Sequence, residues 1–527
     1  MIPAMLTVSC KKSAFVEANI NPSTLTSVDP GAQFLYAAVH ATNDFETYYD
    51  YYRAIMPWMQ MITNSAGNAE NFTNQSGNFN YRYGNFYGNV GLALSDIPHL
   101  VAKMTTAEQA ARVDELAIAA IYKAYYAFYV SDINGSIPYS QAFKARYGGT
   151  LTPTYDEQQN LFDSLDLQVK TAVNTLEATN ESTQTLYGGN DPFYGGAGDE
   201  ALAWEKAGNA LRLKMAMRSL KRNPSGVATI VQEVLADTHQ MSAYTDSWVL
   251  PVGTAFATST SANSNYNPTG FLAAAPLVNF MNANSDPREP IYYRKNVHGI
   301  YLGSPTSPDT CTDAYWQNVY KNDADTFSAV QHRLFTPDFD EGDGNGTGAG
   351  TGFYPLLTYA EYCFIRADLA ARGVTTDDAQ TWYTSGVTAS IQFYDKEAQN
   401  AQIANYTPVT ATQIINYLAA PGVAWNAAKA EELIACQAHI DFYRQPSEAW
   451  AWWKRTGYPN TTSVIALSTL SSNCAFNTLN RSVSLTLLPT SDANYANQQA
   501  AYTQMATDPN FGTSPSDAQG RVWWDAP

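Results

Sequence analysis

Residues 358–393 read TYAEYCFIRADLAARGVTTDDAQTWYTSGVTASIQF and carry the signals of two consecutive helices. Thr358 and Glu361 have the spacing of a capping box, in which a hydroxyl and a carboxylate satisfy free amides at the start of a helix. Gly373 is placed to end this helix in the left-handed conformation, and Asp378 begins the next one. Two amphipathic helices joined by a short turn predict an antiparallel hairpin, the unit of helical repeat arrays.

Similar patterns run outward from this hairpin in both directions. A second capping box at Thr154 and Glu157 precedes apolar residues spaced by three and four, the period of a buried helix face. Further helices are predicted over 107–130, from Trp204 to a point before Pro224, over 426–443 and over 447–455. No strict repeat consensus of about 34 residues is visible. We therefore predict a mainly α scaffold, a degenerate array of helical hairpins with little β structure.

Composition excludes one large class of functions. The chain has 527 residues with 48 acidic and 30 basic side chains, and its net charge is −18. Phosphate binding needs clustered Lys and Arg, so nucleic acid is not a partner, and an acidic surface does not favour anionic lipid. Only 15% of residues are charged while 13% are aromatic, which suits neutral polar ligands such as sugars or peptides.

Three polar stretches interrupt the helical pattern, near 64–89, 244–271 and 336–355. They mix glycine and amide residues with aromatic rings and are too long to be simple connections. We interpret them as insertions over one face of a single domain spanning 11–527, where binding sites concentrate.

The N-terminus suggests a lipid anchor. Residues 6–10 read LTVSC and look like a bacterial lipobox, with Cys10 as the lipidated residue and 1–10 as the remainder of a signal peptide. An ordinary cytosolic N-terminus is the alternative reading of these ten residues. No apolar run is long enough to span a bilayer, so acylation at Cys10 predicts anchoring to a leaflet rather than insertion through it.

The other cysteines form no C-x-x-C pair, so zinc ribbons and thioredoxin chemistry are not indicated. Cys363 and Cys436 lie within helical patterns and are predicted to be buried thiols. Cys311 and Cys474 lie in loop-like sequence, where a disulfide bridge between them stays open.

Motifs of catalysis and of cofactor binding are absent from the sequence. There is no G-x-S-x-G, H-E-x-x-H, Walker A or G-x-G-x-x-G motif, and the six histidines are not at ligand spacing from one another. Glu361 and Glu431 are carboxylates that helix capping or solvation explains. We expect no cofactor.

One acidic cluster is a weak candidate for calcium. Asp338, Asp340 and Asp343 lie close together in the sequence, but Gly342 occupies the fifth position and no Glu closes an EF-hand loop. A solvated acidic loop is the preferred interpretation.

Several blocks resemble the SusD/RagB family of nutrient-binding outer-membrane lipoproteins, and they occur in family order. They are Cys10-Lys11-Lys12 with Glu17 to Pro22, Trp204-Glu205-Lys206 with Asn209 and Leu211 to Arg218, Asp286-Pro287-Arg288 with Tyr292-Tyr293, Thr358 to Gly373, Glu448-Ala449-Trp450, and Lys454 to Pro459. Lys454 stands where the family commonly has Arg, and the first acid after Cys10 is only Glu17, whereas surface lipoproteins often carry acids directly after the lipidated Cys.

The resemblance implies an all-α fold of tetratricopeptide-like hairpins, a lipid anchor at the bacterial outer membrane, surface exposure and no catalysis. It also implies a partner, a SusC-like TonB-dependent outer-membrane barrel that receives oligosaccharide or peptide nutrients. The matching motifs are expected to be scaffold, with Trp450 in the core.

Ligand-binding candidates come instead from the polar stretches. A flat aromatic ring suits the C–H face of a sugar, and neighbouring amides suit its hydroxyl groups; a peptide would use the same groups. The candidate set is Asn80, Tyr81, Tyr83, Trp248, Asn265, Tyr266 and Trp316.

Two other classes of protein stay open at this point. One is an all-α glycoside hydrolase, whose paired carboxylates cannot be recognised from sequence. The other is a periplasmic helical-repeat scaffold that binds only proteins.

Overall fold

The computed structural model describes residues 28–43, 45–64, 80–252, 270–306, 313–336, 350–469, 479–482, 485 and 487–527. The α-helices of the first half are α2 (Pro30–Val39), α3 (Met56–Trp58), α4 (Tyr81–Asn85), α5 (Gly91–Val101), α6 (Thr106–Ala110), α7 (Val113–Asn134), α8 (Gln158–Ala178), α9 (Glu200–Ser219) and α10 (Pro224–Ala236). Those of the second half are α11 (Ala275–Asn284), α12 (Glu289–Tyr292), α13 (Ala314–Asn322), α14 (His332–Phe335), α15 (Tyr359–Ala371), α16 (Ala379–Asn400), α17 (Ala411–Leu418), α18 (Ala430–Asp441), α19 (Pro446–Thr456) and α20 (Tyr495–Met505). Two π-helical segments are η1 (Glu46–Ile55) and η3 (Phe86–Val90), and the strands are β1 (Ile62–Asn64), β2 (Trp248–Val252), β3 (Phe271–Ala273) and β4 (Gly352–Leu357).

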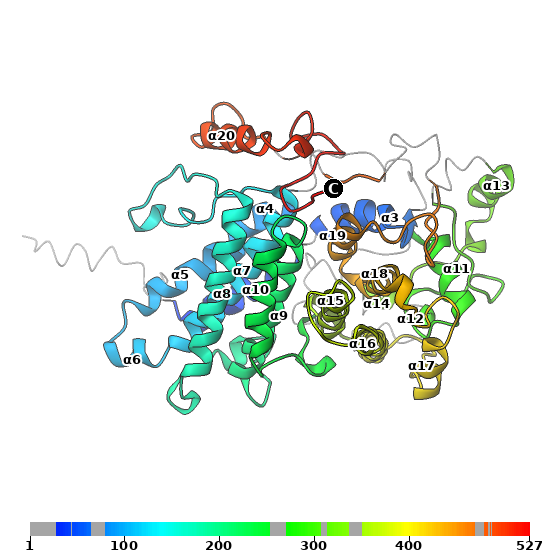
Figure 1. Cartoon of the computed structure of the whole chain (residues 1–527), viewed down its shortest axis with the longest axis horizontal. Coiled ribbons are helices and arrows are strands. Elements are labelled where there is room, and N and C mark those ends of the chain that lie inside the picture. Colours follow the sequence, from blue (N-terminus) through cyan, green and yellow to red (C-terminus); the bar gives the residue numbers. More distant parts are fainter. Residues whose placement is uncertain are drawn as a thin grey trace, which may run out of the picture.

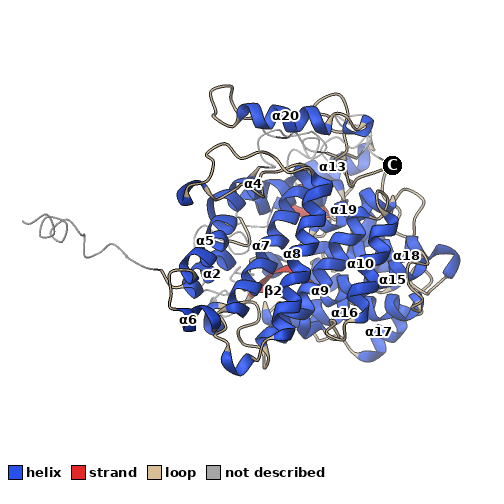
Figure 2. Ribbon diagram, turned by 60° about the vertical axis from the view of Figure 1, so that its left-hand side comes forward, coloured by secondary structure: helices blue, strands red, loops and turns tan. Residues whose placement is uncertain are grey.

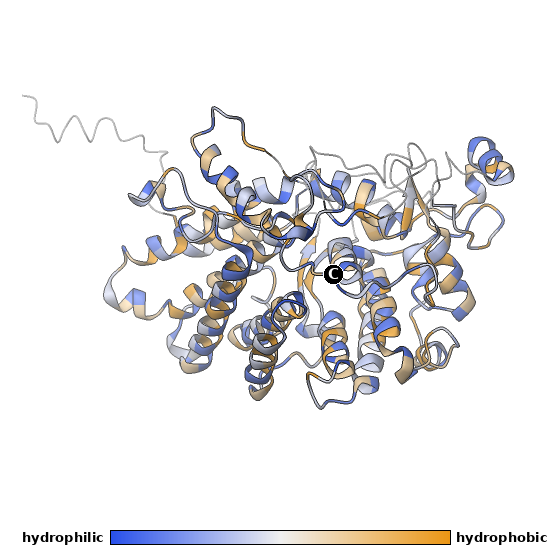
Figure 3. Ribbon diagram, turned by 45° about the horizontal axis from the view of Figure 1, so that its top comes forward, coloured by the Kyte–Doolittle hydropathy of each residue, from blue (hydrophilic) through white to orange (hydrophobic). Residues whose placement is uncertain are grey.

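The prediction of a mainly α fold is confirmed. Helices α7 to α10 pack in succession on one side of the molecule, and α15, α16, α18 and α19 form the adjoining part, with α9 in contact with α15 (Figure 1). In the described part of the chain the strands make two short antiparallel pairs, β1 with β3 and β2 with β4, and little strand is visible among the helices (Figure 2). Many helices carry hydrophilic and hydrophobic stripes side by side, as expected when one face of a helix is buried (Figure 3).

The hairpin of α15 and α16 forms as the sequence predicts. Gly373 follows α15 with φ +69°, and the amide of Val374 donates to the carbonyl of Leu369 at 2.9 Å. This bond satisfies a carbonyl that the helix end would leave free. Asp378 caps α16 by accepting a hydrogen bond from the amide of Thr381 at 2.6 Å.

Three local predictions are corrected. The capping box at Thr154 and Glu157 does not form, because α8 begins later, after Glu157, without a side-chain cap. At Thr358 only the hydroxyl half of the box forms; the carboxylate of Glu361 turns inward to Lys214 instead. The helix predicted over 107–130 is two helices, and Thr105 and Glu108 make a full capping box at the start of α6.

The polar stretches contain more regular structure than predicted. Helix α4 and the π-helix η3 occupy 81–90, and β2 and β4 lie within or at the edge of the other two stretches. The β1–β3 pair places Phe271 beside η1, and this arrangement matters for the candidate site below.

The described end of the chain packs on the body. Trp524 is 1% exposed, and its indole N–H donates to the carbonyl of Asp132 at 2.9 Å. The ammonium of Lys454 lies 3.9 Å from the ring centroid of Trp450 and 4.7 Å from that of Trp524. Lys454, at a position where the family commonly has Arg, is therefore held between two indole rings, and Trp450 is a core residue as predicted.

Cys363 and Cys436 are buried free thiols, as predicted, and burial raises the pKa of each to about 12. No helix among the described residues combines the length and hydropathy needed to cross a bilayer.

Gly208 of α9 packs directly against side chains of α8 and α7. A Cβ added there would lie 2.5 Å from Cγ2 of Val173 and 3.3 Å from Cδ1 of Ile121. Gly208→Val is therefore expected to lower the free energy of unfolding by about 1–3 kcal/mol, because neither neighbour can move freely in a packed layer. Denaturant unfolding measures the change. Gly84→Ala is the control, since no atom lies within 4 Å of its added Cβ; equal effects of the two substitutions would contradict the packing argument.

Candidate functional site

Three aromatic rings gather at the surface where η1 meets α4. Phe45, Tyr49 and Tyr81 have ring centroids 5.4–6.3 Å apart, with interplanar angles of 10–22°. Because the three centroid separations are similar, the near-parallel rings form a compact triangle and not a linear stack. Phe45 is 52% exposed, and the other two side chains are partly exposed. We call these three residues the aromatic platform.

The π-helix sets the spacing of the first two rings. Phe45 directly precedes η1, and Tyr49 follows four residues later on the same side. Such wide turns are rare and recur at functional sites. Tyr48 lies against Tyr49 edge to face at 5.0 Å and against Phe271 of β3 at 6.4 Å, so the strand pair supports the platform from one side.

A buried ion pair fixes the third ring. Arg82, the residue after Tyr81, is 1% exposed, and its Nε donates to Glu46 of η1 at 2.7 Å. Its other nitrogens donate to the carbonyl of Tyr129 at 3.1 Å and to the hydroxyl of Ser447 at 2.7 Å. This guanidinium joins α4 to η1, α7 and α19, so it holds Tyr81 in place relative to Phe45 and Tyr49.

Beneath the platform lies a second acid, Asp50. Its side chain is fully buried, and neither carboxylate oxygen has a hydrogen-bond partner. Burial, with the nearby charge of Glu46, raises the pKa of Asp50 well above its usual range. Burial and the charge of Asp50 also raise the pKa of Tyr81, whose hydroxyl can donate to a ligand.

Of the predicted ligand residues, Asn80 and Tyr81 lie at the platform. Asn80 precedes α4 and is partly exposed. Tyr83 points to the other side of α4, where its ring packs on Tyr87 at 4.5 Å. Trp316 on α13 forms a separate surface group, with its ring 4.9 Å from Tyr315 and 5.7 Å from Phe327.

Trp248 is a core residue, so its assignment to a ligand-binding surface is wrong. It is 0% exposed and lies among the rings of Tyr122, Tyr125, Phe193 and Trp204, 4.8–5.9 Å away. The polar sequence around it conceals β2, whose alternate residues point into the core.

The remaining predicted residues lie outside the described part of the chain. They are Cys10, Asn265, Tyr266, Cys311, Asp338, Asp340, Asp343 and Cys474.

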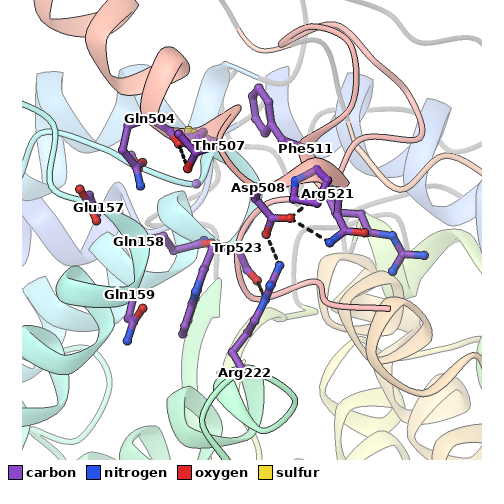
Figure 4. A pocket seen from close by; sticks show the side chains of 15 residues that line it. Glu157, Gln158, Gln159, Arg222, Gln504, Thr507, Asp508, Phe511, Arg521 and Trp523 are labelled. Carbon is purple, nitrogen blue, oxygen red and sulfur yellow. Dashed lines mark hydrogen bonds and ion pairs between the residues drawn. The ribbon is translucent and has the colours of Figure 1, made fainter.

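A cleft of about 430 Å³ opens between α8 and the segment after α20 (Figure 4). Two of its charged groups are paired with each other: Arg222 donates to Asp508 and to the carbonyl of Trp523, and Asp508 also accepts from Asn510. Phe511 is 5% exposed there, so its ring packs inward. The paired groups of this cleft hold the end of the chain to the body, whereas Phe45 of the platform is 52% exposed.

Phe45 and Tyr49 were missed by the sequence analysis. The run Tyr48-Tyr49-Asp50-Tyr51-Tyr52 was the available signal, but neither the helical nor the strand period separates its exposed rings from its buried ones. Flat rings, phenolic hydroxyls and the Asn80 amide together suit a neutral ligand with apolar faces and polar edges.

Comparison with known proteins places this architecture in a family. Residues 22–473 match the family model SusD-like_2, described as "Starch-binding associating with outer membrane". Among solved structures, a chitin-binding protein is similar with a TM-score of 0.75 at 21% identity, over 95% of this chain and 100% of that one. A chitin-binding SusD homologue from Flavobacterium johnsoniae has a TM-score of 0.67 at 18% identity, over 94% and 98%. A SusD homologue from Bacteroides fragilis has a TM-score of 0.67 at 19% identity, over 94% and 100%.

No curated protein sequence matches the chain. At these identities the solved structures bear on the fold alone, whereas the family model spans most of the chain. The chain therefore belongs to this SusD-like family, whose members are carbohydrate-binding, non-catalytic proteins.

Proposed function

We propose that this protein binds a neutral oligosaccharide on the aromatic platform. The observation that carries the proposal is the triangle of near-parallel rings of Phe45, Tyr49 and Tyr81, with Phe45 exposed and the other two partly exposed, in a chain of low charge content. The C–H faces of a sugar can lie on such rings while the Asn80 amide and the tyrosine hydroxyls meet its polar edges. The family description names starch, and two similar structures are titled as chitin-binding, which supports a glycan over a peptide.

The same proposal includes a location and a partner. The protein is held at the outer membrane by a lipid on Cys10 and passes its ligand to a SusC-like TonB-dependent barrel, which supplies the energy for transport. Supporting this part are the lipobox-like residues before Cys10 and a family described as associating with the outer membrane. Because the ligand has to leave again, moderate affinity suits this role.

Removing a platform ring is expected to weaken glycan binding about tenfold. An aromatic contact of this kind contributes on the order of 1–1.5 kcal/mol, and about 1.4 kcal/mol corresponds to a factor of ten. Isothermal titration with chito- and malto-oligosaccharides compares the wild type with Phe45→Ala and Tyr81→Ala. Tyr147→Ala is the matched control, because Tyr147 is also an exposed tyrosine, at 39%. Its ring stacks on His99, which is not a platform residue.

Unchanged affinity in both platform variants would refute the platform as the site. Binding of peptides but of no glycan would refute the ligand class. New reducing ends during incubation would favour the hydrolase alternative, and recovery of only a protein partner would favour the scaffold alternative.

A further inference from the structure

Four ionisable side chains converge where the ends of three helices meet, away from the platform elements. Glu177 stands near the end of α8, Glu205 lies in the second turn of α9, and Asp237 and His239 follow α10. In Figures 1 and 2 these helices run side by side, and α9 packs on both α8 and α10. None of these side chains has a role in the proposed glycan site.

The potential ligand atoms are close together. Nδ1 of His239 lies 2.6 Å from Oε2 of Glu205, 3.7 Å from Oε1 of Glu177 and 3.9 Å from Oδ1 of Asp237. Atoms of Glu177, Asp237 and His239 all lie within 4.8 Å of one another. One ion can reach Glu177, Asp237 and His239, and Glu205, whose Oε2 lies against Nδ1 of His239, can join them only after its side chain shifts.

Glu205 is the buried member of the group, and its carboxylate faces the other three side chains. Its side chain is 5% exposed, and its Oε2 faces the cluster, where Nδ1 of His239 lies 2.6 Å away; neither atom has a further hydrogen bond. A lone negative charge is disfavoured at so buried a position. A carboxylate in such a place needs a proton or a cation.

The charge around the cluster favours a cation. Among the described residues, no Lys or Arg pairs with any of its three carboxylates, and His239 is the nearest basic group. Helices α8 and α10 both point their C-terminal ends, which carry partial negative charge, toward this region.

A neighbouring amide holds part of the cluster in position. Asn209, one turn after Glu205 on α9, is 1% exposed and donates both to the carboxylate of Asp237 and, at 3.0 Å, to the carbonyl of His239. The amide of His239 also donates to Oδ1 of Asp237 at 2.7 Å. Metal ligands are commonly oriented by outer hydrogen bonds of this kind.

We propose that Glu177, Glu205, Asp237 and His239 form a binding site for a divalent transition-metal ion of the Zn²⁺ type. An imidazole nitrogen with carboxylate oxygens is a donor set that such ions accept, whereas Ca²⁺ and Mg²⁺ take oxygen ligands only. The ion would tie the ends of α8, α9 and α10 together. Its role is structural, because the ligands come from three helix ends of the scaffold.

The test uses Zn²⁺ itself as the probe. Isothermal titration of chelator-treated full-length protein is expected to show one Zn²⁺ site, and substitution with Co²⁺ to give a visible absorption spectrum. Glu205→Gln and His239→Ala are expected to lower the Zn²⁺ affinity at least 100-fold, and Asn209→Ala about 10–100-fold. His298→Ala, which removes an exposed histidine elsewhere, is the matched control and is expected to bind like the wild type.

A second measurement covers variants whose folding is weakened. Added Zn²⁺ is expected to raise the unfolding midpoint of the wild type and of His298→Ala, but not that of Glu205→Gln, since only a folded site binds the ion. Absence of Zn²⁺ uptake by the wild type, or equal uptake and stabilisation in Glu205→Gln, would overturn the proposal. Either result would mean that the contact between Glu205 and His239 is complete without a metal ion. Glycan titrations of the same samples are independent of this outcome.

Discussion

Arg218→Met is expected to lower the free energy of unfolding by about 3–5 kcal/mol, because it leaves two buried carboxylates without their shared cation. Arg218 of α9 is 1% exposed. Its Nε donates to Asp132 of α7 at 2.9 Å, and an Nη donates to Glu448 of α19. Neither carboxylate can reach water without displacing helices. The loss is measured as a shift of the denaturant midpoint at an unchanged slope.

Arg146→Met provides the control for this prediction. Arg146 also pairs with an aspartate, Asp96, but its side chain is 53% exposed, so its loss is expected to cost less than about 1 kcal/mol. A midpoint for Arg218→Met within the range of the control would show that the buried network contributes little.

The network around Arg218 extends through Lys214. The Lys214 ammonium lies 2.8 Å from Glu448 and 3.0 Å from Glu361 of α15. Burial disfavours the charged form of Glu448, but the positive charges of Arg218 and Lys214 outweigh this effect of burial. They lower the pKa of the Glu448 carboxyl to about 2. Glu361 is fully buried, and among the described residues it forms an ion pair with Lys214 alone; burial raises its pKa to about 8. The two carboxylates around Lys214 therefore have their pKa values shifted in opposite directions.

The sequence blocks that resemble the family turn out to carry these buried charges. Arg218, Glu361 and Glu448 come from three separate blocks, and Arg455 of another block donates to Asp368 at 2.6 Å. The helices themselves could be predicted because their signals are local: the period of three and four, Gly373 and Asp378. The partners of the charges could not, since each pair joins helices far apart in the sequence.

The difference between local and long-range signals also explains which residues of the candidate site the sequence indicates. Asn80 and Tyr81 were found because a polar, ring-rich stretch is visible in the sequence. Phe45 and Tyr49 were missed because a π-helix follows neither sequence period, and Trp248 was misassigned because its strand lies within a polar stretch. Composition indicates that rings are abundant; only packing determines which of them face water.

Glu289→Gln is expected to stabilise the protein at alkaline pH and to have little effect in acid. Glu289 of α12 is 7% exposed, and its Oε1 has no hydrogen bond. Burial, together with the charge of Asp286, raises its pKa to about 8, against the opposing effect of Lys295. Glutamine keeps the shape of the side chain and removes the charge that the site disfavours.

The sign of this pH dependence follows from the protons that the folded and unfolded states of the protein bind. The unfolded chain releases the proton of Glu289 near pH 4.3, whereas the folded protein releases it only near pH 8. Glu289 therefore contributes most to the free energy of unfolding in acid, and this contribution is lost as the pH rises between those two values. The loss is expected to be on the order of 3 kcal/mol in the wild type and absent in Glu289→Gln. Denaturant unfolding at about pH 5 and about pH 8.5 measures it, with the exposed carboxylate variant Glu431→Gln as control. If Glu289→Gln and the wild type lose stability in parallel over this range, Glu289 is ionised in the folded protein and the burial argument fails.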